Sequence, residues 1–596
     1  MLKLARYIRP HLLSCFAVVL FVSVQVIATL ELPAQMADIV NVGIMQGDGV
    51  GFILQKGAFM LVITLIAGIA AVCAGYFASR VSSAVARDLR KDIFAKVGSF
   101  SLVEFDKFQS ASLIIRSTND IQQVQQMSFF LLRLATMAPL TAVGAIFMAL
   151  RTNTSLAWIL GVALSIIFVV IAILITYAMP LFRLIQEKTD RLNLVAREGL
   201  TGVRVIRAFD RQATQQERFA QVNDELTDIS VKVNRMMVTT MPLMQLIMQF
   251  TTIAIIWFGA QLISDRTMQL GDMMAFLQYA MQILFSVMMF SMVFVMYPRA
   301  SVSAERINDV LETEPTIEDP AIPTATHETV HDRAPEVEFR DVSFAFPGSA
   351  EPVICDITFT AKAGETTAII GSTGAGKSTI LNLAERLYDV TKGAVLVHGV
   401  DVREMSQHHL HGLIAYVPQK AVLFTGTIAD NIRFGKEDAT EEEIGHALAI
   451  AQAAEFVAAE EEGIESTVAQ GGVNFSGGQK QRLAIARAII KRANIYLFDD
   501  SFSALDLKTD AALREALVPE LTDSVAIIVA QRISTIVDAD QILVLDEGRI
   551  VGRGTHIELL DSCDVYREIA ESQLTPEELI AGKPPSEESA GEVPRV

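Results

Sequence analysis

The chain has 596 residues, 51% of them hydrophobic, a mean hydropathy of +0.38 and a net charge of -19. This length exceeds what one hydrophobic core usually serves, so at least two domains are expected. The negative charge, which no Lys/Arg-rich run offsets, argues against nucleic acid as the main partner. The four cysteines have no paired or metal-like spacing, which indicates a reducing compartment for the soluble half.

Apolar stretches long enough to cross a bilayer lie in the first 300 residues. They run at about 11–34, 57–80, 127–150, 156–179, 236–263 and 274–297. Leu12 onward leads directly into a full-length span, so no cleavable signal peptide is expected. We therefore predict a six-span helical transmembrane domain over residues 1–323.

The distribution of positive charge predicts the topology. Lys and Arg gather before the first span and in the two long segments that follow spans two and four. The other connections, 38–56, 151–155 and 264–272, are short and poor in both. This asymmetry places both termini and the long segments in the cytoplasm.

The two long segments are amphipathic and charged. The simplest interpretation is that the spanning helices continue into the cytoplasm and turn there, near Phe105–Asp120 and Glu198–Arg211. Each turn is then a short helix available to contact a soluble domain. The alternative is a pair of solvated loops, although loops this long without structure are uncommon.

Helical spacing separates the faces of the last two spans. One face of span five carries Gln245, Gln249 and Thr252, and one face of span six carries Gln278, Gln282, Phe285, Met289, Met292 and Met296. Polar groups at this depth face protein or water, and Met adapts to varied shapes. These faces form either a pocket for amphipathic cargo or ordinary hydrogen bonds between helices.

A second domain follows a Pro/Thr/His-rich segment, 324–335, which is typical of a linker. The strand-like run 366–370 leads into a phosphate-binding loop and then a helix. The loop comprises Gly371, Ser372, Thr373, Gly374, Ala375, Gly376, Lys377, Ser378 and Thr379. Its backbone amides are expected to wrap phosphates, with Lys377 on the β- and γ-phosphates of ATP and the Ser378 hydroxyl on Mg²⁺.

An apolar strand, 495–499, ends in the acidic pair Asp499 and Asp500. Such a pair is where an ATPase holds its Mg²⁺, here at Asp499, and polarises its attacking water, here at Asp500. Gln419 follows another strand and is positioned to reach the metal and the water. Asp506 closes the segment that comes after the acidic pair and is expected to contact the nucleotide.

A second phosphate-binding segment, Ser476, Gly477, Gly478 and Gln479, begins another predicted helix. A chain with two nucleotide half-sites that face different ways needs another domain to complete each. With this segment, the chain resembles an ATP-binding cassette (ABC) half-transporter of the exporter type, up to about residue 573.

The resemblance implies an α-helical six-span domain followed by an α/β P-loop nucleotide-binding domain, expected over 336–573. It also implies a head-to-tail dimer, in which ATP lies between one chain's phosphate loop and the other chain's Ser476–Gln479 segment. Phe346 matches the aromatic residue that stacks on adenine; the less favoured alternative is that it belongs only to the core. The last residues, 574–596, are predicted to be a disordered tail.

Two positions depart from the family pattern. Asp500 stands where Glu is expected, and Gln531 stands where His is expected. The Asp carboxylate falls short by about 1.5 Å, one carbon–carbon bond, and a misplacement near 1 Å can cost about a hundredfold in rate. Gln531 can donate a hydrogen bond to a γ-phosphate but cannot become cationic. The sequence therefore predicts a site that binds ATP well and hydrolyses it poorly.

This pattern resembles the degenerate-site half of bacterial heterodimeric multidrug ABC exporters. The opening residues 4–10 and the residues Asn474–Ser476, which lead into the second phosphate-binding segment, resemble the same subgroup. Just before that segment the family usually has an acidic–basic pair, whereas this chain has Ala469 and Gln470. Contacts from this loop to the membrane helices that depend on charge are therefore in doubt.

The function that the resemblance implies is ATP-driven export of drugs, lipids or other amphipathic compounds. The expected partners are a second, catalytically competent half-transporter chain and the lipid bilayer of a bacterial inner membrane. Two alternatives remain open on the sequence alone. One is an ATP-gated, weakly hydrolytic conduit or regulator, and the other is a siderophore importer built on the same architecture.

Overall fold

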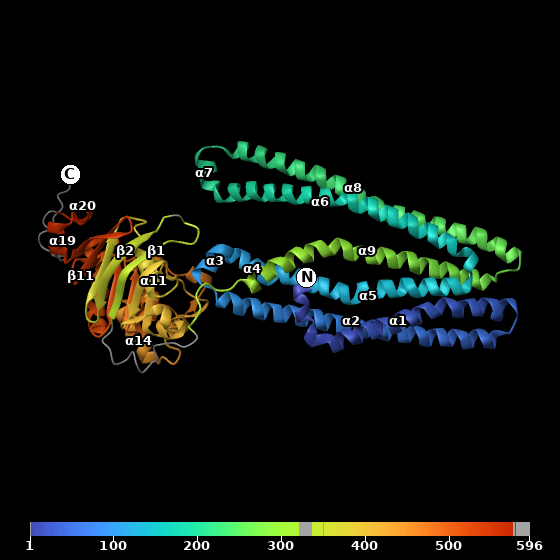
Figure 1. Cartoon of the computed structure of the whole chain (residues 1–596), viewed down its shortest axis with the longest axis horizontal. Helices are drawn as coiled ribbons and strands as arrows, with labels where there is room; N and C mark the ends of the chain where they lie inside the picture. Colours follow the sequence, from blue (N-terminus) through green and yellow to red (C-terminus); the bar gives the residue numbers. More distant parts are fainter. Residues whose placement is uncertain (1, 321–335, 350, 576–578, 580–596) are drawn as a thin grey trace. The chain divides into compact units, whose positions relative to one another are not determined.

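The computed structural model describes residues 2–320, 336–349, 351–575 and 579. The chain divides into two compact units (Figure 1). The first contains Met1–Gly98 and Ser110–Thr313, and the second contains Ser99–Gln109 and Glu314–Val596. The expected linker 324–335 and most of the expected tail lie outside the described residues.

The first unit is built from long helices. Six of its helical stretches are long and apolar enough to cross a membrane, which confirms the six predicted spans. The corresponding helices are α1 (Leu12–Asp38), α2 (Val50–Gly98), α5 (Ile121–Thr152), α6 (Ala157–Thr201), α8 (Gln212–Ser264) and α9 (Leu270–Glu312). Several run well beyond the length that a bilayer requires, so they extend past it.

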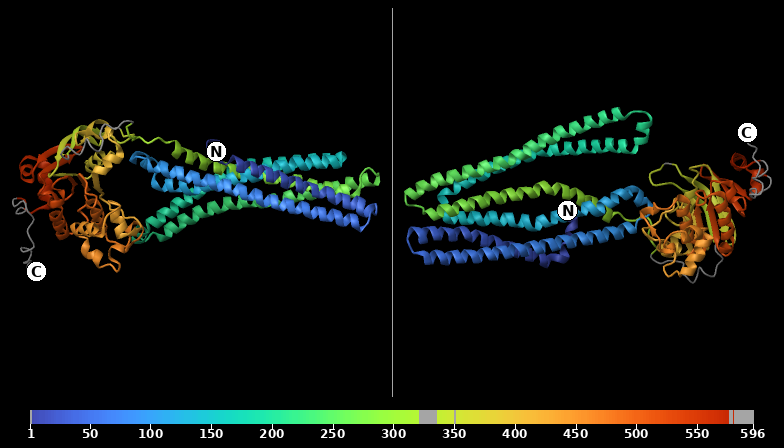
Figure 2. Two further views of the ribbon diagram at one scale, coloured as in Figure 1. Left: turned by 90° about the horizontal axis from the view of Figure 1, so that it is seen from below. Right: turned by 180° about the vertical axis from the view of Figure 1, so that it is seen from behind.

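The helices pack as pairs around a small-residue core. α1 lies along α2, α5 along α9, and α6 along α8, as the views of the first unit show (Figures 1 and 2). Alanines on α2 and α5, including Ala74 and Ala145, are fully buried and allow close approach of the helices. The Tyr279 hydroxyl, on α9, donates to the Leu30 carbonyl oxygen at 3.1 Å and so satisfies a buried polar group.

The short connection after α1 is held by polar contacts. A π-helical turn, η3 (Ile39–Met45), presents Asn41 to the start of α9. The Asn41 side chain donates to Asp272 at 3.0 Å and accepts from the Gly271 amide at 2.7 Å. A Cβ atom at Gly271 would lie 2.4 Å from the Ala37 carbonyl oxygen, so this close approach requires glycine.

The two long charged segments that follow spans two and four are helical throughout most of their length. α3 (Leu102–Phe108) begins slightly before the expected turn, with Ser101 and Glu104 forming a capping box, and it packs with the second unit. α4 (Ser110–Ile115) follows at once. α7 (Val203–Ala208) joins α6 to α8 and buries none of its side chains within the first unit.

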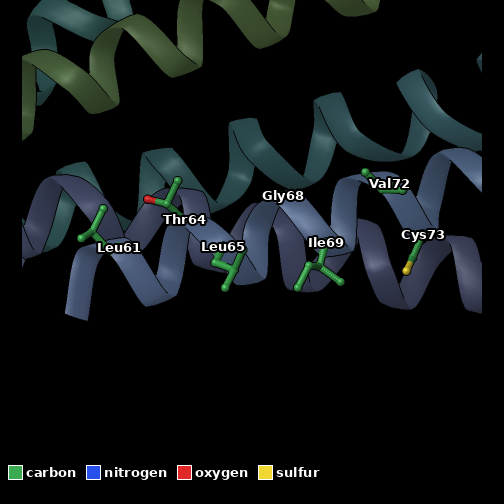
Figure 3. Close-up of a pocket in the computed structure, with 7 residues that line it drawn as sticks. All are labelled: Leu61, Thr64, Leu65, Gly68, Ile69, Val72 and Cys73. Atoms are coloured by element: carbon green, nitrogen blue, oxygen red, sulfur yellow. The ribbon is translucent and has the colours of Figure 1, made fainter. Parts of the chain in front are cut away.

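One side of α2 stays uncovered in the single chain. An apolar hollow runs along this helix (Figure 3). Its lining residues are Leu61, Thr64, Leu65, Gly68, Ile69, Val72 and Cys73. All these residues belong to one spanning helix, so this surface is expected to face lipid or another apolar surface.

The second unit is an α/β domain with two large sheets and a two-stranded sheet, in which β7 (Gly426–Thr427) pairs with β8 (Thr467–Val468). The smaller of the two large sheets is antiparallel, in the order β2 (Ile354–Lys362), β1 (Glu336–Phe344), β4 (Lys392–Val397) and β5 (Val400–Asp401). The larger sheet has the order β12 (Arg549–Gly554), β11 (Gln541–Asp546), β3 (Thr366–Gly371), β10 (Val525–Val529), β9 (Ile495–Asp499) and β6 (Ile414–Val417). All its neighbouring pairs are parallel except β11 with β12.

Helices cover the larger sheet, and its central strands are buried on both faces. Successive residues of β9 pack into different cores, Leu497 into one and Phe498 into the other. The main covering helices are α11 (Lys377–Ala384), α14 (Glu441–Ile450), α16 (Gly477–Ile489), α17 (Leu507–Leu517), α19 (His556–Ser562) and α20 (Asp564–Gln573). The predicted fold class, six spanning helices followed by an α/β domain, is confirmed.

The strand order determines where the site residues meet. In sequence the strands come as β3, β6, β9 and β10, but in space β3, β10, β9 and β6 are successive parallel neighbours. Their carboxyl ends therefore share one edge of the sheet. Ligands of open α/β sheets bind at that edge, and here each strand delivers one segment of the predicted site to it.

Candidate nucleotide-binding site

The phosphate loop connects β3 to α11, as predicted. Gly371 lies against β11, where a Cβ atom would be 2.0 Å from the Leu545 carbonyl oxygen, so any other residue would have to displace backbone. Gly374 and Gly376 have φ values of +88° and +96°, which favour glycine. Ser372 and Thr373 are exposed, whereas Ala375 and Thr379 are buried. The second half of the loop is therefore packed against the domain, and the first half is open to solvent.

Lys377 is folded back into the loop. Its Nζ donates to the carbonyl oxygens of Gly371 at 2.9 Å and Ser372 at 2.8 Å. Burial lowers the pKa of Lys377, while the charges of Asp500 and Asp499 act in the opposite direction. A cation held in this loop is available to a phosphate as a point charge.

Ser378 and Asp499 come together at the predicted metal position. The Ser378 hydroxyl donates to Asp499 Oδ1 at 2.9 Å, and the Tyr416 hydroxyl lies 3.5 Å from Asp499 Oδ2. Burial raises the pKa of Asp499, and the neighbouring Asp500 carboxylate adds to the effect. A bound divalent cation would favour the charged form of this carboxylate.

These two oxygen donors fit Mg²⁺, which is usually held by one or two protein carboxylates together with substrate phosphates. The described residues contain no group of three His, Cys, Asp or Glu side chains that could hold a metal by themselves. We therefore expect the phosphates of ATP to complete the coordination, with Ser378 and Asp499 as the protein's contribution.

Asp500, Gln419 and Gln531 form one hydrogen-bonded group. Gln531 Nε2 donates to Asp500 Oδ2 at 2.8 Å, and Gln419 Nε2 donates to the same oxygen at 3.0 Å. Asp500 is 7% exposed and has a φ of +49°, a conformation that Asp tolerates better than most residues. The three predicted catalytic residues are thus brought together, with the carboxylate already engaged by two amides.

Phe346 lies two residues after the end of β1 and is distant in sequence from this group. Its ring packs edge-on against Tyr388, with centroids 5.4 Å apart, and against Phe344 at 5.0 Å. Phe346 is 36% exposed, so one part of the ring belongs to the small-sheet core and the rest is open to stack on a base. Both predicted environments, core and adenine contact, are therefore compatible with its position.

The Ser476–Gln479 segment forms the exposed start of α16. Ser476 caps this helix: its hydroxyl accepts from the Gln479 amide at 3.3 Å, and the Ser476 amide donates to Gln479 Oε1 at 2.8 Å. Gly477 is exposed and Gly478 packs near the Ala504 carbonyl oxygen. No hydrogen bond among the described residues joins this segment to the phosphate loop, so it presents its anion-binding helix end outward.

In the single chain, Asp506 stabilises the start of α17. Its carboxylate caps α17 by accepting from the Thr509 amide at 3.0 Å, and that bond holds the pKa of Asp506 low. The side chain is exposed and close in sequence to the acidic pair. Its predicted contact with nucleotide therefore remains a proposal.

Several residues that the sequence did not single out support the site. Gln481 is buried and donates to the Pro418 carbonyl oxygen, which fixes the segment before Gln419. Arg532 donates to the Ser503 carbonyl oxygen at 3.1 Å, and Gln573 contacts the backbone on both sides of Arg532. None of these contacts belongs to a motif, because each depends on tertiary neighbours.

Tyr388 connects Phe346, the predicted adenine contact, to α3. Its ring packs on Phe346, and its hydroxyl donates to Asp106 of α3 at 3.1 Å. Glu104 of the same helix accepts bonds from Ser101 and Thr316. Burial raises the pKa of Tyr388 to about 12, with the Asp106 carboxylate adding to it, so the hydroxyl remains a donor at neutral pH.

Two family models match most of the chain. The model described as the ABC transporter transmembrane region covers residues 15–287, and the one described as ABC transporter covers residues 354–503. A solved bacterial Atm1-family ABC exporter with ATP bound shares the fold, with a TM-score of 0.78 over 96% of this chain and 99% of that chain, at 24% identity.

Characterised and uncharacterised relatives extend over nearly the same length. An uncharacterized ABC transporter ATP-binding protein of Mycobacterium tuberculosis is 42% identical over 573 residues, which is 96% of this chain and 97% of that protein. An ATP-dependent lipid A-core flippase of Pseudomonas fluorescens is 33% identical over 518 residues, 85% of this chain and 84% of that protein. The chain therefore belongs to the ABC transporter family, as a half-transporter with one membrane domain and one ATP-binding domain, and it has the fold of an ABC exporter.

Proposed function

We propose that this chain is the degenerate-site half of a heterodimeric exporter. Its own ATP site, with Asp500 and Gln531, binds ATP and hydrolyses it slowly. Its Ser476–Gln479 segment completes the competent site of a different partner chain. The observation that carries this proposal is the group at Asp500, in which the carboxylate belongs to the shorter Asp and no side chain can become cationic as His can.

The geometry supports a slow site. A general base must reach the attacking water, and Asp places its carboxylate about 1.5 Å short of where Glu would. Here Asp500 Oδ2 accepts from both Gln419 and Gln531, which further favours its present position. The residues expected to hold ATP, Lys377 and Ser378 among them, are in place, so binding is retained while the chemical step is weakened.

Two uncovered surfaces support a second chain. The start of α16 is exposed, and among the described residues it makes no hydrogen bond to the phosphate loop of its own chain. On and beside α7, Val205 is 61% exposed and Phe209 is 74% exposed, although this turn is expected in the cytoplasm. Apolar side chains exposed to water in this way are typical of an interface.

A cavity in the first unit supports amphipathic cargo. It has a volume of about 180 Å³ and lies between α1, α5 and α9. Its lining residues are Val26, Thr29, Met137, Ala138, Thr141, Gln282, Phe285, Ser286 and Met289. The Gln282 amide oxygen is buried there and, among the described residues, has no hydrogen-bond partner. An apolar group with a nearby donor fits this lining, since a cavity of about 150 Å³ admits one aromatic ring.

The flippase relatives act on a lipid, so lipids belong to the class of cargo proposed here. ATP hydrolysis, with Mg²⁺ as the cofactor, drives the export. The lipid bilayer of a bacterial inner membrane holds the first unit, and the second unit lies in the cytoplasm. This arrangement follows the positive-inside rule applied to the spans.

The proposal predicts very low activity for the chain alone. The purified wild-type homodimer should hydrolyse ATP barely above background, because both of its sites carry Asp500 and Gln531. A steady-state ATPase assay with a Lys377→Ala homodimer as the zero point measures this. Turnover at about 1 s⁻¹ or faster, an ordinary enzyme rate, would contradict the proposal.

The cargo proposal predicts that filling the cavity impairs transport. Met289→Trp, in the assembled transporter in vesicles, should raise the half-saturating concentration of an amphipathic dye about tenfold, the equivalent of about 1.4 kcal/mol of lost binding. Met241→Trp is the matched control, because Met241 is 65% exposed and outside the cavity lining. Equal kinetics in the two variants would exclude this cavity as a cargo site.

A further inference from the structure

Gln531 stands on a segment with little structure of its own. β10 ends at Val529, and the helix that follows, α18 (Ile533–Ile536), has four residues. Helices this short are not stable by themselves. The N-cap residue, Arg532, provides no side-chain acceptor for the first amides of α18. The position of Gln531 therefore depends on contacts from elsewhere in the domain.

The last residue of α20 supplies two of these contacts. Gln573 Nε2 donates to the Gln531 carbonyl oxygen at 2.9 Å. Gln573 Oε1 accepts from the Ile533 amide at 2.8 Å. One planar side-chain amide thus holds the backbone on both sides of Arg532, and two bonds from one plane fix the direction of the segment as well as its position.

α20 is a firm support for this contact. Tyr566 and Ala570 on α20 are fully buried, and the Tyr566 hydroxyl bonds the His556 ring at 2.7 Å. Leu574, directly after Gln573, packs against the hydrophobic core. The end of the helix is therefore anchored on both sides of the residue that holds the Gln531 segment.

The Gln531 segment also contacts the predicted catalytic group at Asp500. The Gln531 side chain donates to Asp500 at 2.8 Å, and Arg532 donates to the Ser503 carbonyl oxygen at 3.1 Å. A shift of the backbone at Gln531 is passed directly to its side chain. Gln573 itself makes no hydrogen bond to the phosphate loop or to Asp500 among the described residues.

We infer that Gln573 is a positioning residue for Gln531. Through its two main-chain hydrogen bonds, the C-terminal helix α20 determines where residue 531 stands relative to Asp500 and to the terminal phosphate of ATP. The inference rests on the proposed place of residue 531 beside that phosphate. Because Gln573 bonds only the backbone at residues 531 and 533 and none of the residues expected to hold ATP, it affects the rate of hydrolysis and leaves the affinity for ATP nearly unchanged.

The first measurement tests the contact itself. Amide hydrogen exchange of the full chain, followed in peptides that cover residues 531–536, should be faster at Ile533 in Gln573→Ala than in the wild type. Gln573→Glu keeps an acceptor for the Ile533 amide and loses the donor to the Gln531 carbonyl. It should therefore protect Ile533 nearly as well as Gln573. Ser572→Ala is the matched control, since Ser572 is exposed on the same turn and bonds only within its own helix.

The second measurement tests the consequence for the rate. The background is the Asp500→Glu, Gln531→His homodimer, in which each restored site meets an intact Ser476–Gln479 segment. The main-chain bonds to Gln573 do not depend on the side chain at 531. Gln573→Ala and Gln573→Glu should lower kcat about tenfold, within the cost of a misplacement near 1 Å. KM for ATP should change less than about twofold, and Ser572→Ala should alter neither constant.

The two measurements distinguish a failure of this inference from a failure of the proposed weak site. Equal exchange at Ile533 in the wild type and Gln573→Ala overturns the inference, and so does faster exchange with an unchanged kcat. A parallel loss of ATP affinity and rate also overturns it, because that pattern indicates general destabilisation. If the wild-type homodimer proves fast, the proposed weak site is wrong, and the same variants are compared in the wild-type chain. If no background turns over, the exchange result decides alone.

Discussion

Gly477→Asp is expected to lower ATP turnover of the assembled transporter at least about a hundredfold while leaving the fold of this chain intact. A Cβ atom at Gly477 would meet nothing within 4 Å, and the residue is exposed at the start of α16. An acidic side chain at a helix N-terminus even favours the helix. The same charge would repel a phosphate held by the partner, and losing such stabilisation typically costs 10²–10³ in rate.

The controls locate the effect. Gly445→Asp changes another exposed helical glycine with open space around it, on α14, and should leave turnover unaltered. Lys377→Ala should mainly weaken nucleotide binding at this chain's own site and lower turnover less than Gly477→Asp. ATPase assays of the reconstituted heterodimer measure all three. A larger loss from Lys377→Ala than from Gly477→Asp would reverse the assignment of the competent site.

The second large effect is a gain. Asp500→Glu together with Gln531→His should raise hydrolysis at this chain's own site at least roughly tenfold, within the usual range for a positioned acid–base group. Glu extends the carboxylate by about 1.5 Å beyond its present position, and His supplies a group that can become cationic. Each change alone should do much less, because groups that act as one unit are strongly non-additive.

Two comparisons make this result specific. Asp500→Asn with Gln531→His has no carboxylate and should give no gain. The homodimer carries an intact Ser476–Gln479 segment at every site, so the gain should be full there. In a heterodimer whose partner segment is degenerate, as the resemblance implies, it should be only partial. No gain in the homodimer would show that Asp500 and Gln531 do not limit the site.

The sequence by itself determined the parts of the protein that depend on local pattern. Hydropathy located the six spans, because an apolar stretch of about 20 residues has few other stable positions. The phosphate loop was recognisable because its glycines serve a conformation that few other residues adopt, as the φ values of Gly374 and Gly376 show. The sequence also predicted the helix that begins at this second phosphate-binding segment, now α16, and the apolar strand that is now β9.

The tertiary structure decided which of these residues meet. Gln419, Asp500 and Gln531 follow three different strands, and they share one carboxylate oxygen only because β6, β9 and β10 are spatial neighbours. Strand order is set by packing of the whole sheet, which no local pattern encodes. The position of α3 in the second unit and the two bonds from Gln573 have the same origin, since hydrogen bonds between distant segments form only after the core has fixed them.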